Sequence, residues 1–401
     1  MFDLHPPGYE YKTGRGLKTT PIYERQKEQG AIFGESMGWE RPKWFDRDRV
    51  GETPSYTRNR SFETVAKECH AVRDAVGIFD LSSFTKIEVS GADAHGFLSR
   101  VLANNVPTKV GGLALCHLLN DNGVIEAEMT VTRLDEDRFF ILSAGGMRAR
   151  DFDQLQKLHT PQFDIEFTDV TDDYGCLAIG EPKSRDVLNK LKDADLSNAA
   201  FRWLSAKEII VAGVKVRALR VSYAGELVWE LYAPMDGLSK LYDALLTAGE
   251  EFGIVTAGMY ALNSLRMEKG YRGFGTEMTN EVTPIEADMM RFVSKRKTDF
   301  RGAEALAGNR TKLSGYQLVY GEVDAPHLDI MGSEPIYAGD PLVGLTTSGG
   351  YGHCSGKNLA FAYVKSDAVA GPLHVETLGN RYAVTLLDDP AFDPENLRPR
   401  A

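Results

Sequence analysis

Apolar residues recur at helical spacing in five stretches of the chain. After Ser61, apolar side chains between positions 62 and 76 return every three or four residues and share one face. This pattern predicts a helix that is capped by Ser61 and stopped by Gly77. The same spacing predicts helices over 92–104, 182–192, 236–249 and 259–268.

Alternation of apolar and polar residues indicates strands between these helices. The run LALCHLL (113–119) is followed by the turn residues 120–123 and by a second alternating run, 125–134, which together predict a β-hairpin. Further strands are predicted at 85–89 and as a pair within 218–233. Strands and helices are therefore mixed along the chain, as in folds that pack helices against sheets.

The chain divides into three parts by composition. Residues 1–60 are rich in Gly, Pro, Arg and aromatic residues and show no sustained period, which is typical of an arm. Because disordered segments are poor in aromatic residues, we expect this arm to pack on the main body, with contact to a partner as the alternative. Residues 301–401 show short strands with frequent turns, which predict a small antiparallel barrel or sandwich. The part between them, 61–300, is expected to form the central domain.

Charge and composition exclude several classes of protein. The 401 residues include 46 Lys and Arg against 57 Asp and Glu, a net charge of −11, so no general basic surface is available and no nucleic-acid partner is expected. The four cysteines lie far apart, which argues against a zinc pair or a disulfide framework and favours a reducing compartment. The N-terminus is polar, and no run approaches the ~18 apolar residues that a membrane span needs. We therefore expect a soluble cytoplasmic protein that does not enter a membrane.

Several common catalytic motifs are missing from the sequence. The glycine-rich segment SGGYGHCSGK (348–357) is not a phosphate-binding loop, because Tyr351 and Asn358 replace its first Gly and its Ser or Thr. We predict a barrel turn there instead. No Gly-x-Gly-x-x-Gly lies near the N-terminus, so a flavin or nicotinamide in the usual dinucleotide fold is not expected. The histidines lack metal-ligand pairing, so we expect no metal site, and we expect no serine nucleophile.

Glu126 and Glu128 form a candidate pair of catalytic acids. They follow the hairpin turn on one face of a predicted strand, roughly 7 Å apart. Their mutual repulsion would raise the pKa of one carboxyl toward the value of a useful general acid if the site is dry. The alternative is a solvated polar face of the strand.

Tyr223 and Glu230 flank the turn in SYAGELVWEL (222–231). A hairpin centred near Glu226 and Leu227 would place them across from one another. The carboxylate of Glu230 could then accept two parallel N–H donors from the edge of a heterocycle. Glu226 is expected to have a structural role in the turn. The alternative makes Glu230 an exposed strand residue and Tyr223 a half-buried one.

Arg266 lies beside the apolar stripe formed by Leu262 and Leu265 on the last predicted helix. In this place the guanidinium could clamp an anionic ligand. A surface ion pair with Glu268 or Glu286 is the alternative.

Seven segments carry a family resemblance: KTTPIYERQKEQGAIFGESMGWERPKWF, VGIFDLSSFTKIEVSGADAHGFLSRVLANNV, HLLNDNGVIEAEMTV, VSYAGELVWELYAP, ALNSLRMEKGYRGFGTEM, TPIEAD and TTSGGYGHCSGKNLAFAYV. Together they resemble the aminomethyltransferase family of the glycine cleavage system, the T-protein. They are still more similar to the folate-binding half of dimethylglycine and sarcosine dehydrogenases. The match covers nearly the whole chain, and the arm resembles the stretch that joins the flavin half to the folate half in the fused dehydrogenases.

The resemblance implies an α+β fold in which two α/β lobes and a C-terminal β-barrel form a three-lobed ring around a tetrahydrofolate channel. It implies that Glu128 lies next to the one-carbon centre and that Tyr223 lies near the reactive nitrogens, and we take these two as the catalytic residues. It also implies that Glu230 grips the pterin edge and that Arg266 borders the ligand channel. The cofactor-binding residues that we expect are Glu230, Arg266, Glu226 and Glu126.

The sequence departs from the T-protein pattern at several positions. Glu128 stands where the T-protein motif usually has Asp, Leu115 stands where some T-proteins have a ligand-facing Tyr, and Phe274 stands where Tyr is common. A substrate pocket different from that of the T-protein is therefore expected. The segment EKGYRGFGTE (268–277) lacks the Cys of the related iron–sulfur maturation proteins, which argues against that branch.

The resemblance implies a tetrahydrofolate-dependent one-carbon transferase that acts on a methylated amine of the dimethylglycine or sarcosine type. A separate flavin-containing dehydrogenase subunit would oxidise the amine, and 5,10-methylenetetrahydrofolate would be the product. One alternative is a freestanding demethylase that moves a methyl group from an onium or methoxy donor and gives 5-methyltetrahydrofolate. A non-catalytic folate-binding subunit is the other alternative.

Overall fold

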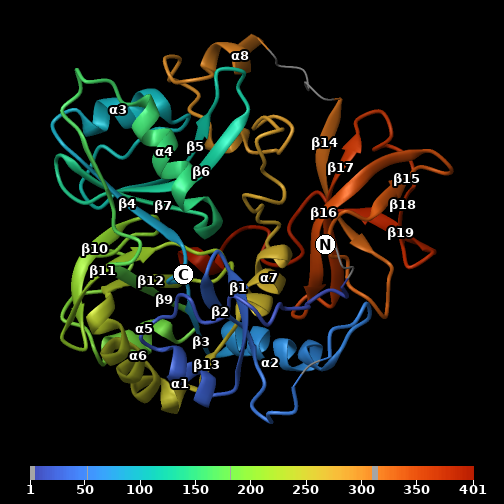
Figure 1. Ribbon diagram of the computed structural model, residues 1–401, viewed down its shortest axis with the longest axis horizontal. Coiled ribbons are helices and arrows are strands. Elements are labelled where there is room, and N and C mark those ends of the chain that lie inside the picture. Colours follow the sequence, from blue (N-terminus) through green and yellow to red (C-terminus); the bar gives the residue numbers. More distant parts are fainter. Residues whose placement is uncertain (1–4, 52, 181, 309–314) are drawn as a thin grey trace.

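The computed structural model describes residues 5–51, 53–180, 182–308 and 315–401. They form three lobes and an N-terminal arm (Figure 1). In this view one lobe lies at the lower left, a second at the upper left and a barrel at the right, with helix α7 (Met259–Glu268) between them. This arrangement confirms the three-lobed α+β fold that the resemblance implied. None of the helices described in the structure is long and apolar enough to cross a membrane.

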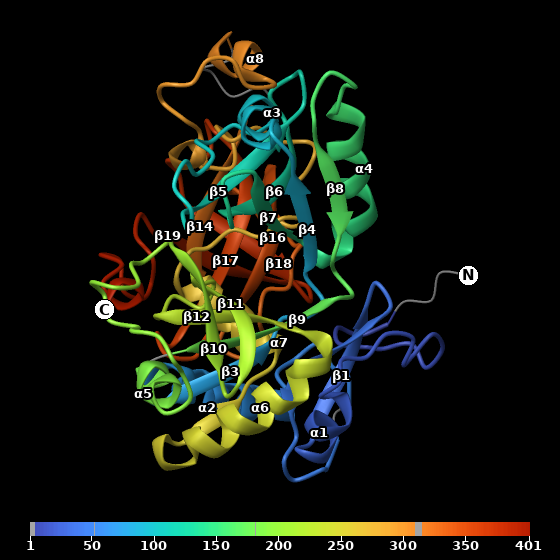
Figure 2. The same ribbon diagram turned by 90° about the vertical axis from the view of Figure 1, so that its left-hand side faces the viewer.

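The first lobe is built on a six-stranded sheet. Its strand order is β10 (Ala206–Val211), β11 (Val214–Arg220), β12 (Val228–Pro234), β9 (Tyr174–Gly180), β3 (Val76–Asp80) and β13 (Ile254–Thr256). Helices α5 (Ser184–Asn189) and α6 (Met235–Gly249) pack with this sheet (Figure 2). Leu238 of α6 lies so close to β9 that a Cβ on Gly175 would be 2.5 Å from its Cδ2 atom, so any larger residue there would displace the Leu238 side chain.

The second lobe contains a five-stranded antiparallel sheet. Its order is β5 (Leu113–Leu119), β6 (Ile125–Arg133), β7 (Arg138–Ser143), β4 (Thr85–Ser90) and β8 (Glu166–Asp169), with helices α3 (Ala94–Val101) and α4 (Arg148–Leu158). The predicted β5–β6 hairpin is confirmed. Ile125 and Met129 are fully buried on one face of β6, because alternate residues of a strand point to the same side.

The C-terminal lobe is a closed barrel, as predicted. Its order is β14 (Tyr316–Val323), β17 (Lys357–Lys365), β16 (Leu342–Gly352), β15 (Pro335–Tyr337), β18 (Leu373–Thr377) and β19 (Asn380–Leu386). Helix α8 (Ala303–Gly308) precedes it in the chain. The glycine-rich segment 348–357 spans the end of β16, a turn and the start of β17, so the predicted barrel turn is confirmed.

The arm contains regular elements that its sequence pattern did not predict. They are helix α1 (Tyr23–Glu28) and the antiparallel strands β1 (Ala31–Ser36) and β2 (Trp39–Phe45). Strand β2 packs against α7 and against α2 (Arg60–Asp74), and Trp44 is completely buried. Both faces of β2 are largely buried, so its residues do not alternate between apolar and polar types. The expectation that the arm packs on the body is confirmed.

The first predicted helix has different ends from those expected. Asn59 caps α2, since its side chain accepts a hydrogen bond from the backbone N–H of Ser61 at 3.0 Å. Gly77 lies inside β3 and does not stop the helix. A Cβ at this position would lie 2.2 Å from Cγ2 of Val72, so the glycine permits close packing of β3 on α2. The helices predicted over 92–104, 182–192, 236–249 and 259–268 are confirmed as α3, α5, α6 and α7, with α3 and α5 shorter than expected.

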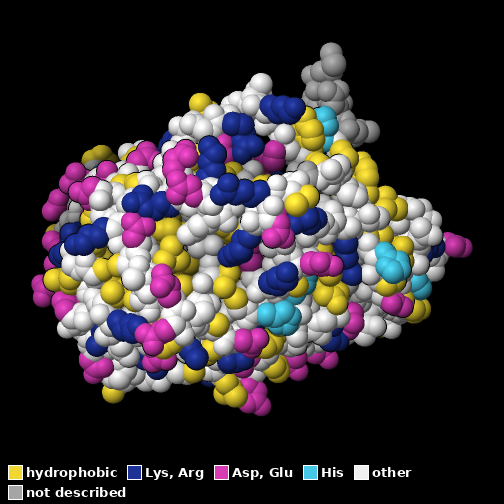
Figure 3. All heavy atoms as spheres, turned by 90° about the horizontal axis from the view of Figure 1, so that it is seen from below, with side chains coloured by type: hydrophobic (Ala, Val, Ile, Leu, Met, Phe, Trp, Pro, Cys, Tyr) yellow, Lys and Arg dark blue, Asp and Glu magenta, His cyan; other side chains and the backbone are white. Residues whose placement is uncertain are grey.

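Charges of both signs are present on the lower face of the molecule. On the face drawn in Figure 3, which is the underside of Figure 1, basic and acidic side chains are interspersed with one another and with apolar side chains.

Candidate active site

The β5–β6 hairpin carries both predicted acids on one face. The strand register places His117 directly opposite Glu128, and Oε1 of Glu128 lies 3.6 Å from Nε2 of His117. Glu126 forms an ion pair with Arg150 and accepts a hydrogen bond from Nδ2 of Asn120 at 3.0 Å. The expected interaction between two repelling carboxylates is therefore wrong, because Arg150 compensates the charge of Glu126. The alternative of a solvated polar face holds only in part, since the side chains of Glu126 and Glu128 are 15% and 19% exposed.

Glu230 is a carboxyl group without a cationic partner. It lies on β12, and its Oε2 accepts a hydrogen bond from the hydroxyl of Tyr232 at 2.7 Å. Among the residues that the structure describes, no Lys, Arg or His forms an ion pair with it. Burial raises the pKa of Glu230 to about 7. The side chain is nevertheless partly accessible, so it can take further hydrogen-bond donors from a ligand.

Tyr223 lies in the loop between β11 and β12. The register pairs Leu219 with Glu230, so the predicted opposition of Tyr223 and Glu230 is wrong. Residues 221–227 form a longer connection than the tight turn that the pattern indicated. The hydroxyl of Tyr223 donates a hydrogen bond to the backbone carbonyl of Arg272 at 3.1 Å.

The surroundings of Tyr223 bring together side chains from three parts of the chain. Burial raises the pKa of its hydroxyl, the positive charge of Arg266 acts in the opposite direction, and the negative charges of Glu128 and Glu277 raise the pKa further. Glu128 and Arg266 thus each lie within electrostatic range of Tyr223. These are three of the residues that the sequence singled out.

Arg266 is buried, and each of its three guanidinium nitrogens donates a hydrogen bond to a protein group. Its Nη1 forms an ion pair with Oε2 of Glu277 at 3.1 Å, its Nη2 donates to Oγ of Ser348 at 2.8 Å, and its Nε donates to Oδ1 of Asn263 at 3.0 Å. Only 5% of the residue is exposed. The guanidinium therefore joins α7 to the barrel strand β16, and each of its three nitrogens already donates to a protein group.

The alternative of a surface ion pair between Arg266 and Glu268 or Glu286 is wrong. Glu268 pairs with Arg73 at 3.1 Å, and Oε2 of Glu286 accepts a hydrogen bond from the backbone N–H of Thr283 at 2.8 Å. The partner of Arg266 is Glu277, because the turn after α7 returns the chain to the helix.

Sequence reasoning missed Glu277 as a residue of this region. It is fully buried. Its carboxylate accepts hydrogen bonds from the backbone N–H of Gly273 at 2.8 Å, from Oγ1 of Thr276 at 2.8 Å and from Oγ1 of Thr347 at 2.7 Å. The signal available in the sequence was an acid at the end of the glycine-rich run RGFGTE.

Glu226 is 1% exposed and forms an ion pair with Arg73 at 2.8 Å. Arg73 also donates to the backbone carbonyl of Ala224 at 2.8 Å and binds Glu268 on its other side. Glu226 therefore holds the β11–β12 loop against α2. Its charge is compensated within the protein, unlike that of Glu230.

Leu115 and Phe274, two positions that depart from the T-protein pattern, pack against one hydrophobic cluster that includes Leu119 and Met278. The surroundings of Leu115 and Phe274 are therefore apolar, and neither residue supplies the phenolic hydroxyl that a tyrosine would.

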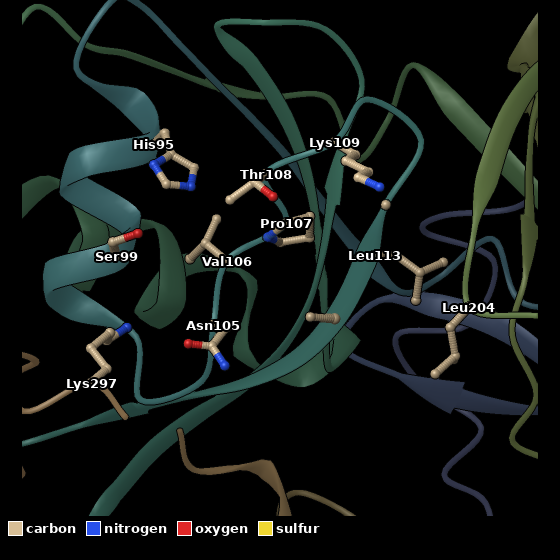
Figure 4. A pocket seen from close by; sticks show the side chains of 12 residues that line it. His95, Ser99, Asn105, Val106, Pro107, Thr108, Lys109, Leu113, Leu204 and Lys297 are labelled. Carbon is tan, nitrogen blue, oxygen red and sulfur yellow. The ribbon is translucent and has the colours of Figure 1, made fainter. Parts of the chain in front are cut away.

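A pocket of about 530 Å³ lies away from these residues, between α3 and the start of β5 (Figure 4). His95, Lys109 and Lys297 are among its lining residues, and none of the predicted site residues is. Lys297 donates hydrogen bonds to the carbonyls of Leu102 and Asn104 at 2.6 and 2.8 Å, so its ammonium group completes the end of α3. This pocket is therefore separate from the candidate active site.

Two α/β lobes and a closed barrel, with acids and a tyrosine gathered from several segments, define the class of the glycine cleavage T-protein. The GCVT N-terminal domain matches residues 22–297, and the glycine cleavage T-protein C-terminal barrel domain matches residues 317–393. The chain belongs to this family.

The chain is also similar to individual enzymes along nearly its whole length. The chain is 36% identical over 389 residues to mitochondrial dimethylglycine dehydrogenase of Mus musculus, covering 96% of this chain and 44% of the relative. It is 32% identical over 404 residues to 4-methylaminobutanoate oxidase (formaldehyde-forming) of Paenarthrobacter nicotinovorans, covering 100% of this chain and 49% of that enzyme. The chain thus spans about half the length of these curated relatives.

A solved structure confirms the fold over the whole match. The glycine cleavage system aminomethyltransferase T from Bartonella henselae superposes with a TM-score of 0.80 at 26% identity, over 94% of this chain and 99% of that chain. The family and this structure indicate that the chain binds tetrahydrofolate.

Among the predicted site residues, the carboxyl group of Glu230 is the one that suits the pterin edge of this cofactor. The pterin ring of tetrahydrofolate presents a ring N–H beside an amino group, which together require a carboxylate without another cationic partner. Glu230 meets this requirement, because Tyr232 is its one described hydrogen-bond partner. Arg266, Glu126 and Glu226 do not offer an uncompensated charge of this kind.

Proposed function

We propose that this chain is a tetrahydrofolate-dependent one-carbon transferase that accepts the carbon unit of a methylated amine of the dimethylglycine or sarcosine type. A flavoprotein subunit oxidises the amine, and the product is 5,10-methylenetetrahydrofolate. The observation that carries the proposal is the uncompensated carboxyl of Glu230, in a chain whose relatives include dimethylglycine dehydrogenase.

Glu230 has the task of binding and orienting the cofactor. Its carboxylate accepts the two parallel N–H groups of the pterin edge, while Tyr232 fixes the carboxylate from the protein side at 2.7 Å. When bound, tetrahydrofolate supplies the nucleophilic nitrogens that take up the carbon unit.

Glu128 has the task of handling protons and charge. No described Lys or Arg pairs with it, whereas Arg150 pairs with Glu126 on the same strand. The carboxylate of Glu128 is therefore not compensated by a described Lys or Arg, and it can attract a cationic iminium or ammonium group. It also accepts the proton released as the acceptor nitrogen forms its bond to carbon, and it returns a proton to the donor nitrogen, which leaves as the amine when its bond to that carbon breaks. Tyr223, within electrostatic range of Glu128, helps to position the reacting groups.

Calorimetric titration with tetrahydrofolate under anaerobic conditions tests the binding step. We expect micromolar binding by the wild type and weaker binding by Glu230→Ala. Product analysis then tests the reaction, with sarcosine or dimethylglycine and a flavoprotein dehydrogenase, or with formaldehyde as the carbon source.

The alternatives give different results in the same experiment. A 5-methyltetrahydrofolate product formed from an onium or methoxy donor without a flavoprotein would replace the proposal by a freestanding demethylase. Binding without any turnover would leave a non-catalytic folate-binding subunit. Full turnover by Glu128→Gln with intact binding would overturn the role of Glu128.

A further inference from the structure

His117 is a buried polar side chain without a satisfied hydrogen bond. It is 0% exposed, and neither of its ring nitrogens has a hydrogen-bond partner among the described residues. The ring of Phe292 meets it edge-on, with centroids 6.2 Å apart and planes at 80°. A buried donor or acceptor left unpaired costs about 1–3 kcal/mol, so a purely structural role would favour an apolar residue here. Leu115 and Leu119 show that the neighbouring positions on this strand are apolar.

Glu128 is the charged group that faces His117. The two residues are direct cross-strand partners in the β5–β6 hairpin (Figure 1), and Nε2 of His117 lies 3.6 Å from Oε1 of Glu128. A shift of less than about 1 Å would produce a hydrogen bond of ordinary length. Catalytic hydrogen bonds are often long in the free enzyme and shorten in the complex with substrate.

The two acids of β6 are held by different kinds of partner. Arg150 compensates the charge of Glu126, whereas a neutral imidazole can donate a hydrogen bond to Glu128 without cancelling its charge. An acid that is oriented but not neutralised remains both a base and an attractant for a cation.

We propose that His117 is a positioning residue for Glu128. Its Nε2–H donates a hydrogen bond to Oε1 of Glu128 in the substrate complex and leaves Oε2 free to accept the proton of the reaction. This inference rests on the function proposed above and adds a residue that acts through Glu128 and does not itself touch the substrate.

Three variants test the proposal, with dimethylglycine, a flavoprotein dehydrogenase and tetrahydrofolate as the reactants, and with the rate measured without this chain subtracted. His117→Leu removes the N–H donor and replaces the imidazole by an apolar side chain that suits the buried position. His117→Gln keeps an N–H close to the position of Nε2, and Glu128→Gln removes the acceptor charge. The readouts are kcat, KM and the pH profile of the rate, together with the Kd of tetrahydrofolate from calorimetry.

We expect His117→Leu to lower kcat by roughly 10- to 100-fold, because a misplacement of about 1 Å at a reacting group can have this effect. The Kd of tetrahydrofolate stays unchanged, because Glu230 binds the pterin. We expect His117→Gln to restore most of the rate. In the Glu128→Gln background, His117→Leu should cause no further loss, because both variants remove the same interaction.

The outcomes separate this inference from the proposed function. If Glu128→Gln lowers the rate and His117→Leu does not, the positioning role of His117 is wrong and the function stands. If Glu128→Gln turns over normally, the roles of Glu128 and His117 are both wrong and the function stands. If the wild type does not bind tetrahydrofolate, the proposed function itself fails. Should His117→Leu not fold, a pH profile of His117→Gln identical to that of Glu128→Gln would overturn the proposal, and a profile like that of the wild type would support it.

Discussion

Arg266 and Glu277 form a buried ion pair, with Nη1 of the arginine 3.1 Å from Oε2 of the glutamate. The glutamate is fully buried and the arginine is 5% exposed. Since the glutamate also accepts a hydrogen bond from Thr347 of the barrel at 2.7 Å, the pair joins α7, the turn that follows it and β16. We interpret Arg266 as a residue that fixes the arrangement of the lobes around the site.

We expect Glu277→Gln to destabilise the protein by about 3–5 kcal/mol, because it leaves a buried guanidinium without a counter-charge. Thr347→Val is the matched control. It removes one neutral donor to the same carboxylate and should cost about 1 kcal/mol. Denaturant unfolding of both variants measures the difference in the free energy of unfolding. Equal losses in the two variants would show that the ion pair is not needed to hold the junction.

The pKa of Glu230 should make tetrahydrofolate binding depend on pH. The free carboxyl has a pKa of about 7, and N–H donors from the pterin favour its charged form, so binding lowers this pKa. The affinity is therefore expected to be constant well above pH 7 and to fall by up to about tenfold per pH unit below it. Calorimetry from pH 5.5 to pH 8.5 measures this dependence.

Glu230→Gln is the control for this titration. Hydrogen bonds to a charged group contribute about 1.5–3 kcal/mol, so the variant should bind roughly 10- to 100-fold more weakly than the wild type at pH 8. Its affinity should be independent of pH over the same range. A wild-type profile that keeps its slope in this variant would assign the pH dependence to another group.

Glu226→Gln should affect stability and leave the cofactor affinity unchanged. Glu226 pairs with Arg73 at 2.8 Å and is 1% exposed, and Arg73 retains Glu268 as a second partner. We expect a loss of about 1–3 kcal/mol in the free energy of unfolding and a Kd of tetrahydrofolate within about twofold of the wild type. Calorimetry beside Glu230→Gln makes the comparison direct, because both variants make the same chemical change. Weaker binding by Glu226→Gln would restore its assignment as a cofactor ligand.

The elements of the fold follow from local patterns, whereas their arrangement does not. Alternation along Ile125–Arg133 and helical spacing along Met259–Glu268 predicted β6 and α7 correctly. Strand β2 was missed because its two faces are both buried, which removes the alternation. The three-lobed ring came from the family resemblance, since packing between distant segments leaves no period in the sequence.

The sequence pointed to the residues of the candidate site, but it could not show which side chains pair with them. The sequence singled out Glu126, Glu128, Glu230 and Arg266. It could not show that Arg150 compensates Glu126. The partners come from other segments of the chain, so the difference between a free carboxylate and a compensated one appears only in the folded structure.

Glu68 anchors the arm to the body of the protein. One oxygen of its buried carboxyl accepts the backbone N–H of Phe45 at 2.9 Å, and the other accepts the backbone N–H of Gly258 at 2.9 Å. Glu68→Ala leaves both N–H groups unpaired, at a cost of about 1–3 kcal/mol each. We expect a lower free energy of unfolding and faster proteolysis of the arm. Glu63→Ala, at an exposed position on the same helix, is the control and should change stability by less than about 1 kcal/mol.

The charge of Glu68 adds a dependence on pH that can be measured separately. Burial raises its pKa from the ordinary value of 4.5 to about 7, so the folded state binds more protons than the unfolded state between these values. Its contribution to stability is therefore fully present below pH 4.5 and is lost as the pH rises through about 7. Glu68→Gln removes the titration, so the wild type should lose stability relative to this variant over that range. If the free energies of unfolding of the two proteins differ by the same amount at every pH, Glu68 keeps an ordinary pKa and burial does not disfavour its charge.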